Sequence, residues 1–174
     1  MMTVTSSRAY QYCKNSIDKE TTPRYVQMQM RDWMRIAEGK DEKYFVSEKK
    51  VQQIENILKL LIMPKGLKAG QSMYKCATGY QWLIYIAVLC TVYRDNPKKR
   101  RYETGLLELS RKNFKTFTVG TIFIILFLTE PRFSKFYSVA PDGSLSKEIK
   151  EAISDTIKSS PLIYQYKAKS GSSC

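Results

Sequence analysis

Residues 102–128, YETGLLELSRKNFKTFTVGTIFIILFL, decide the predicted fold of this chain. They begin with a short apolar segment typical of a strand, continue as a polar loop that ends in Lys115-Thr116, and finish as a strongly apolar helix. Backbone N–H groups at a helix N-terminus attract phosphate, a lysine reaches the outer phosphates of a nucleotide, and a threonine hydroxyl holds Mg²⁺. The order strand, loop, Lys-Thr and helix therefore predicts a nucleotide-binding loop.

The loop matches only part of the nucleotide-binding signature G-x-x-x-x-G-K-[ST]. Leu109 and Phe114 stand at the two positions where that signature has glycine. Glycine before the lysine lets the backbone approach the phosphates closely. The side chain of Phe114 would crowd them unless it points into the core.

Composition sets the broad class of the protein. The chain has 174 residues, which suits one domain, and 43% of them are hydrophobic, which is enough for a core. Its 29 Lys and Arg against 16 Asp and Glu give a net charge of +13, which favours polyanions such as nucleic acid or an anionic membrane surface. Four scattered cysteines without a C-x-x-C pair, and no histidine, argue against a zinc site and against Ser-His or Cys-His chemistry.

Two apolar runs, residues 80–93 and 117–128, are the segments to weigh as membrane spans. Both are shorter than the roughly 18 to 20 residues that a bilayer-crossing helix needs. The N-terminal residues are polar, so no signal peptide is expected. We predict two buried core helices and no membrane partner.

Other segments contain residues that typically begin or end a helix. The first 20 residues are expected to be loosely structured. Helices are predicted from Thr22-Pro23 to Gly39, from Ser47 to Pro64, and from Ser144 or Ser146 to Ser159, and a second strand over residues 135–140. The predicted fold class is α/β: an N-terminal helical segment over residues 1–66, the incomplete parallel sheet of a P-loop NTPase over residues 67–166, and a disordered tail over residues 167–174.

The densest positive patch is Lys98-Lys99-Arg100-Arg101, in the turn that precedes the first predicted strand. It is typical either of a solvated turn or of a segment that contacts the phosphate backbone of DNA. The sequence leaves both interpretations open.

Three segments in the same order resemble the ATPase end of the phage terminase large subunit, the motor that packages viral DNA. Residues 110–116, SRKNFKT, look like that family's deviant Walker A loop, and residues 79–82, GYQW, look like its aromatic-glutamine segment. Residues 135–140, the turn Pro141-Asp142-Gly143 and the helix after it are similar to the family's next strand-helix unit. The resemblance covers roughly residues 44–166.

The resemblance implies a chain that binds ATP and Mg²⁺ and contacts double-stranded viral DNA in the host cytoplasm during virion assembly. Terminase small subunit, portal protein and further copies of the chain are the other partners it implies. By position, Lys115 would contact the β- and γ-phosphates, Thr116 would also coordinate Mg²⁺, and Gln81 would read the adenine. The full set of implied nucleotide-binding residues is Ser110, Arg111, Lys112, Asn113, Lys115, Thr116 and Gln81, and the implied DNA contacts are Lys98, Lys99, Arg100 and Arg101.

Two parts of a complete terminase are missing from the sequence pattern. No apolar strand ending in paired carboxylates follows the loop, so no Walker B acid is found, and the family's nuclease domain is not found either. We expect a truncated N-terminal part that binds ATP without complete catalysis, which leaves open whether it is an enzyme. A small basic DNA-binding module with an incidental Lys-Thr loop is one alternative, and a membrane-surface protein built on the two apolar runs is another.

Overall fold

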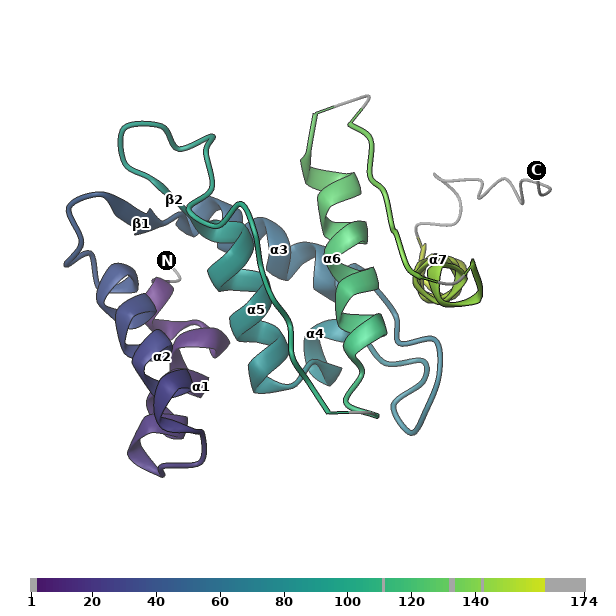
Figure 1. The fold of residues 1–174 in the computed structure, drawn as a ribbon, viewed down its shortest axis with the longest axis horizontal. Helices are drawn as coiled ribbons and strands as arrows, with labels where there is room; N and C mark the ends of the chain where they lie inside the picture. Colours follow the sequence, from purple (N-terminus) through teal and green to yellow (C-terminus); the bar gives the residue numbers. More distant parts are fainter. Residues whose placement is uncertain (1–2, 111, 132–133, 142, 162–174) are drawn as a thin grey trace. The chain divides into compact units, whose positions relative to one another are not determined.

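The computed structural model of the chain describes residues 3–110, 112–131, 134–141 and 143–161. Its helices and strands are named as in Figure 1. In order they are η1 (Val4–Ser6), α1 (Arg8–Asp18), α2 (Arg24–Ala37), β1 (Tyr44–Val46), α3 (Glu48–Leu60), α4 (Met73–Cys76), α5 (Gly79–Cys90), β2 (Thr91–Tyr93), α6 (Lys115–Thr129) and α7 (Gly143–Ser159). The chain divides into two compact units. The first comprises residues up to 55 and residues 77–106, and the second comprises residues 56–76 and those from 107 onward.

The first unit is built on α1, α2 and α5, with a short β-ribbon. α1 and α2 lie side by side, and α1 also packs on α5 (Figure 1). α1 begins after Ser7, whose hydroxyl accepts a hydrogen bond of 3.3 Å from the backbone N–H of Tyr10. Ala9 and Cys13, four residues apart on one face of α1, are fully buried. Most of the described residues up to 20 therefore belong to an amphipathic helix, and the expectation of loose structure was wrong.

The β-ribbon pairs β1 with β2 in antiparallel register, with Tyr44 opposite Tyr93, Phe45 opposite Val92 and Val46 opposite Thr91. α5 runs directly into β2, so the segment predicted as one helix over residues 80–93 ends three residues earlier than expected. Trp33 of α2 donates from its indole Nε1 to the Thr91 hydroxyl at 3.2 Å, which fixes the ribbon to α2. Thr91 and Val92 are fully buried.

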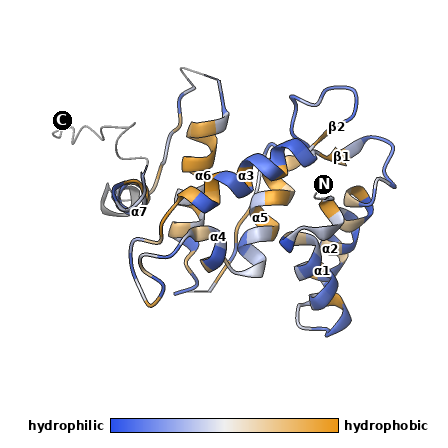
Figure 2. Cartoon of the chain, turned by 180° about the vertical axis from the view of Figure 1, so that it is seen from behind, coloured by the Kyte–Doolittle hydropathy of each residue, from blue (hydrophilic) through white to orange (hydrophobic). Residues whose placement is uncertain are grey.

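The second unit is organised by the packing of α6 on α7. α6 is hydrophobic along most of its length (Figure 2). Gly120 of α6 faces α7, where a Cβ at that position would lie 3.4 Å from the Cβ of Ala152. The segment after α3 contacts α7 and the residue that follows it. The backbone N–H of Ile62 donates to the Ser160 hydroxyl at 2.9 Å, and Lys65 pairs with Asp155 at 2.6 Å.

The predicted α/β fold class is wrong. Within the described residues the chain is mostly helical, and its one sheet is the two-stranded antiparallel β1–β2 ribbon, so the parallel sheet of a P-loop NTPase is not formed. The segments predicted as strands, residues 102–109 and 135–140, form none among the described residues. A strand of a parallel sheet is covered on both faces, whereas Leu106, Tyr137 and Val139 are 88%, 75% and 92% exposed. Both segments contain apolar residues, but among the described residues they have no neighbouring strand.

The helices expected from start and stop signals were placed correctly. α2, α3 and α7 agree with the predicted helices to within a few residues. None of the helices in the described part of the chain combines the length and apolarity needed to cross a bilayer. The predicted disordered tail over residues 167–174 lies outside the described residues.

Candidate functional site

The loop before α6 makes a tight turn with two residues in the left-handed region. Lys112 has φ of 68° and Phe114 has φ of 53°. These conformations are uncommon for residues other than glycine. Inside the turn the side-chain amide of Asn113 donates to the hydroxyl of Ser110. Lys115 follows this turn as the first residue of the helix.

The N-terminus of α6 has no side-chain cap. Phe114 is the N-cap residue, and a phenyl ring offers no acceptor for the first helical N–H groups. The first bond of the helix runs from the backbone N–H of Thr118 to the carbonyl oxygen of Phe114 at 2.8 Å. The N–H groups of Lys115, Thr116 and Phe117 precede that bond, so they belong to the set that a helix leaves without an intrahelical acceptor.

The charges within the first turn of α6 favour an anion, whereas Glu148 and Glu151 of α7 line the cavity beside it. Positive helix-dipole charge is concentrated at the N-terminus, and the first turn of α6 carries no acidic residue. The side chains of Lys112 and Lys115 are exposed and Thr116 is half-buried. Phe114 is 58% exposed, so its ring does not enter the core.

The predicted site residues divide between the two units. Ser110, Lys112, Asn113, Lys115 and Thr116 all lie in the loop and first turn of α6, in the second unit. Arg111 lies outside the described residues.

Gln81 belongs to the first unit, where it has a clear structural contact. It is 5% exposed, and its Oε1 accepts from the backbone N–H of Thr78 at 2.9 Å and from the Thr78 hydroxyl at 3.1 Å. The two residues form a capping box at the start of α5. The assignment of Gln81 to an adenine contact stays a prediction.

The basic segment, residues 98–101, follows an Asn96-Pro97 turn, in which the backbone N–H of Lys98 donates to Asn96 Oδ1 at 3.2 Å. Lys98 is exposed. Lys99 pairs with Glu103 at 3.3 Å, and this hydrogen bond raises the pKa of Lys99. Arg101 has only 22% of its side chain exposed and pairs with Asp32 at 2.8 Å. The segment therefore combines a solvated cation with a structural one.

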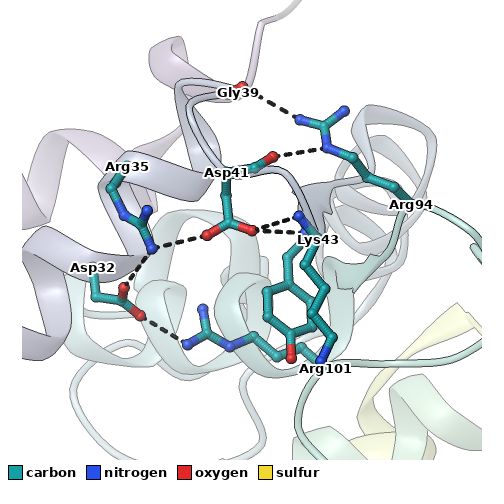
Figure 3. Close-up of polar contacts among 8 residues, drawn as sticks. Asp32, Arg35, Gly39, Asp41, Lys43, Arg94 and Arg101 are labelled. Atoms are coloured by element: carbon teal, nitrogen blue, oxygen red, sulfur yellow. Dashed lines mark hydrogen bonds and ion pairs between the residues drawn. The ribbon is translucent and has the colours of Figure 1, made fainter.

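Arg101 is part of a polar cluster that joins β1 and β2 to α2 (Figure 3). Asp41 receives the backbone N–H groups of Lys43 and Tyr44 on one carboxylate oxygen, at 3.0 and 2.8 Å, and Arg35 on the other, at 2.8 Å. The Nε of Arg94 donates to the carbonyl oxygen of Asp41 at 2.9 Å. Sequence reasoning missed this cluster, because nothing in the spacing of these residues signals the pairing of β1 with β2.

Cations also stand over the aromatic rings of the β-ribbon. Tyr44 and Tyr93 meet edge to face with ring centroids 4.9 Å apart, as opposite residues of the two strands. The Nζ of Lys43 lies 5.5 Å from each of these rings, and the Nζ of Lys99 lies 5.1 Å from Tyr93. Such stacking holds the ammonium groups at the surface of the ribbon.

A protein-only metal site is not found among the described side chains, where no three His, Cys, Asp or Glu groups come together to hold an ion. Comparison of the chain with protein-family models, with curated proteins and with solved structures finds no match. Function is therefore inferred from the chain's own residues.

Proposed function

We propose that the chain binds ATP with Mg²⁺ through the loop of residues 110–116, as the N-terminal part of a DNA-packaging motor of the terminase large subunit type. The observation that carries this proposal is the uncapped N-terminus of α6, with Lys115 and Thr116 in its first turn. The resemblance of residues 110–116 to the terminase family's Walker A loop supports it further. A parallel sheet is not part of the proposal.

Each component of the loop has a chemical role. The N–H groups of residues 115–117 and the helix dipole bind phosphate oxygens without needing a preceding strand. Lys115 would add a point charge that reaches the outer phosphates, and the hydroxyl of Thr116 would supply one oxygen ligand to a Mg²⁺ bound with the nucleotide. The ion needs few protein ligands, since Mg²⁺ commonly keeps several waters and phosphate oxygens.

DNA contact is assigned to the basic surface of the β-ribbon. Lys98 is exposed in the loop that follows β2, and Lys43 lies against the aromatic rings of the ribbon. Cations on an exposed ribbon neutralise phosphates of a duplex without reading its sequence. We assign no contact to Arg101, because its guanidinium pairs with Asp32.

The test is a titration of the full chain with a fluorescent ATP analogue and Mg²⁺. We expect saturable binding that Lys115→Ala weakens by at least tenfold and that Thr116→Val weakens only when Mg²⁺ is present. Lys158→Ala is the matched control, because it removes an exposed lysine from the last turn of α7. Equal binding by wild type and Lys115→Ala would reject the proposed site.

The helical fold favours one second candidate, a basic DNA-binding module in which the Lys-Thr loop is incidental. A nucleotide-binding loop normally follows a strand of a parallel sheet, and residues 102–109 form no strand. This candidate predicts salt-sensitive binding of duplex DNA and no binding of nucleotide in a folded sample. The same titration therefore separates the two candidates.

A further inference from the structure

A cavity of about 280 Å³ opens beside the first turn of α6, within the second unit. Thr116 and Phe117 of α6 line it, together with Phe114 and the Met63-Pro64 segment. Its volume lies near the lower limit of the roughly 300 to 1,000 Å³ that is usual for small-molecule pockets. A single flat ring system suits such a cavity better than a large ligand does.

One wall of the cavity is apolar and aromatic. It is formed by Phe114, Phe117 and Met63, of which Phe117 and Met63 are half-buried. Aromatic rings bind nucleobases by stacking, and such stacking tolerates any base because every base has a π-face. This wall therefore provides the non-specific part of base binding.

The cavity is also lined by carboxylates from α7. Glu148 and Glu151 line the cavity and are exposed, and their spacing of three residues places them on one face of the helix. A carboxylate accepts hydrogen bonds from the exocyclic amino group of a base. It also repels phosphate, so a nucleotide would enter this cavity with its base and leave its phosphates at the end of α6.

An ion pair also lines the cavity. Lys65 and Asp155 both line it, and they pair at 2.6 Å. The hydrogen bond to Asp155 raises the pKa of Lys65, which keeps the pair charged. Because Asp155 is engaged in this pair, Glu148 and Glu151 are the carboxylates that face a ligand.

We propose that this cavity is the base-binding part of the nucleotide site and that it selects an amino-bearing base. The base stacks on Phe117 and donates from its exocyclic amino group to Glu148 or Glu151. This inference rests on the proposed function, since it takes the phosphates to be held at residues 115–117. It assigns the base to residues other than Gln81, whose Oε1 is engaged by Thr78.

The test compares ATP, inosine triphosphate and inorganic tripolyphosphate, each with Mg²⁺, by calorimetric titration of the full chain. Inosine triphosphate is the matched ligand, because it is a purine nucleotide without the exocyclic amino group. We expect ATP to bind roughly tenfold more tightly than inosine triphosphate, as one charge-assisted hydrogen bond would give. Tripolyphosphate should bind more weakly than either nucleotide.

Separate variants test the carboxylates of α7 and the aromatic part of the cavity. The double variant Glu148→Gln, Glu151→Gln should remove the preference for ATP over inosine triphosphate while tripolyphosphate binds at least as well as before. Phe117→Ala should weaken both nucleotides roughly tenfold and leave tripolyphosphate unchanged. Glu108→Gln is the control for a change of charge, because Glu108 is exposed and does not line the cavity. Phe117→Leu keeps an apolar side chain at the site should Phe117→Ala fail to fold.

The outcomes distinguish this inference from the proposed function. If tripolyphosphate binds and ATP binds no better, or if ATP and inosine triphosphate bind equally, the base pocket is rejected and the phosphate site stands. If Gln81→Ala abolishes the preference for ATP and the α7 variants do not, the base lies at Gln81 and this inference is wrong. If none of the three ligands binds, both proposals are rejected.

Discussion

Asp41 shows how one carboxylate organises the entry to β1. Its two oxygens accept from the backbone N–H groups of Lys43 and Tyr44 and from Arg35. The hydrogen bond from the N–H of Tyr44, followed by that from Lys43 and the charges of Arg35 and Arg101, lowers the pKa of Asp41 below its ordinary value of 3.8. The folded state thus favours the ionised carboxylate more strongly than the unfolded state does.

This shift predicts acid-dependent stability. A lowered pKa contributes stability that is present above pH 3.8 and is lost as the pH falls through the lower folded value. We expect Asp41→Asn to have a lower urea midpoint than wild type at pH 6, and the difference to shrink at pH 3. Asp18→Asn serves as the control because Asp18 is exposed at the end of α1. A difference between Asp41→Asn and wild type that is the same at pH 6 and pH 3 would contradict the assignment.

Gly79 is required because the ring of Tyr12 lies too close to leave room for a Cβ, and not because of its backbone conformation. A Cβ at this position would lie 2.1 Å from Cδ2 of Tyr12, well inside van der Waals contact. We expect Gly79→Ala to lower the free energy of unfolding by about 1–3 kcal/mol, the usual cost of overpacking. Gly105→Ala meets nothing within 4 Å and is the control. Adding Tyr12→Ala to Gly79→Ala should restore part of the loss, and full additivity of the two changes would contradict the contact.

At the scale of elements, sequence reasoning succeeded where the signal is local. The Thr22-Pro23 start and the Gly39 stop of α2 are chemical features of single residues, and α2 begins and ends beside them. α7 was placed by the serines at its start and by its apolar spacing. α1 was missed because its buried face is made of small residues such as Ala9 and Ser16, which a search for large apolar side chains overlooks.

Reasoning about strands failed because a strand needs a partner that local sequence does not name. The segment 102–109 contains three leucines and was predicted as a short apolar strand, yet the described structure gives it no strand partner. The strands that do form, β1 and β2, are three residues each and are separated by 44 residues between Val46 and Thr91. So short a strand shows no period of two in its sequence.

The packing of α6 on α7 makes a prediction at this scale. Gly120 lies where a methyl group would meet Ala152 at 3.4 Å, an ordinary contact distance. Gly120→Ala should therefore stabilise the chain by about 0.5–1 kcal/mol, because it raises helix propensity without a clash. Gly120→Leu should destabilise it by about 1–3 kcal/mol, because the larger side chain would force α6 and α7 apart. Chemical denaturation measures the free energy of unfolding of both variants. Equal changes in this free energy would mean that Gly120 does not face α7.

The candidate site was predictable to the extent that it is contiguous. Lys112, Lys115 and Thr116 are close in sequence, so the sequence alone placed them at one helix end, and α6 does begin at Lys115. The cavity beside them joins α6, α7 and residues 63–65, and no motif links those segments in the sequence. The missing parallel sheet could not have been foreseen from the loop, because the same Lys-Thr turn requires only the helix that follows it.

For the whole molecule, the net charge of +13 predicts binding to duplex DNA that weakens steeply with salt. Each phosphate contact contributes about 0.9 to the slope of the logarithm of the binding constant against that of the salt concentration. Lys98→Ala should reduce this slope by about that amount, whereas Lys158→Ala should leave it unchanged. Fluorescence anisotropy at several salt concentrations measures this slope. An unchanged slope in Lys98→Ala would remove the β-ribbon from the DNA-binding surface.

Hydrogen exchange of the full chain, with and without Mg²⁺ and ATP, tests most directly whether the N-terminal end of α6 holds the phosphates. The backbone N–H groups of residues 115–117 have no intrahelical acceptor, so they should exchange quickly in the free protein. Saturating nucleotide should slow their exchange in wild type and leave it unchanged in Lys115→Ala. Unchanged exchange at these amides in wild type, at a nucleotide concentration that saturates binding, would contradict the claim that the end of α6 holds the phosphates.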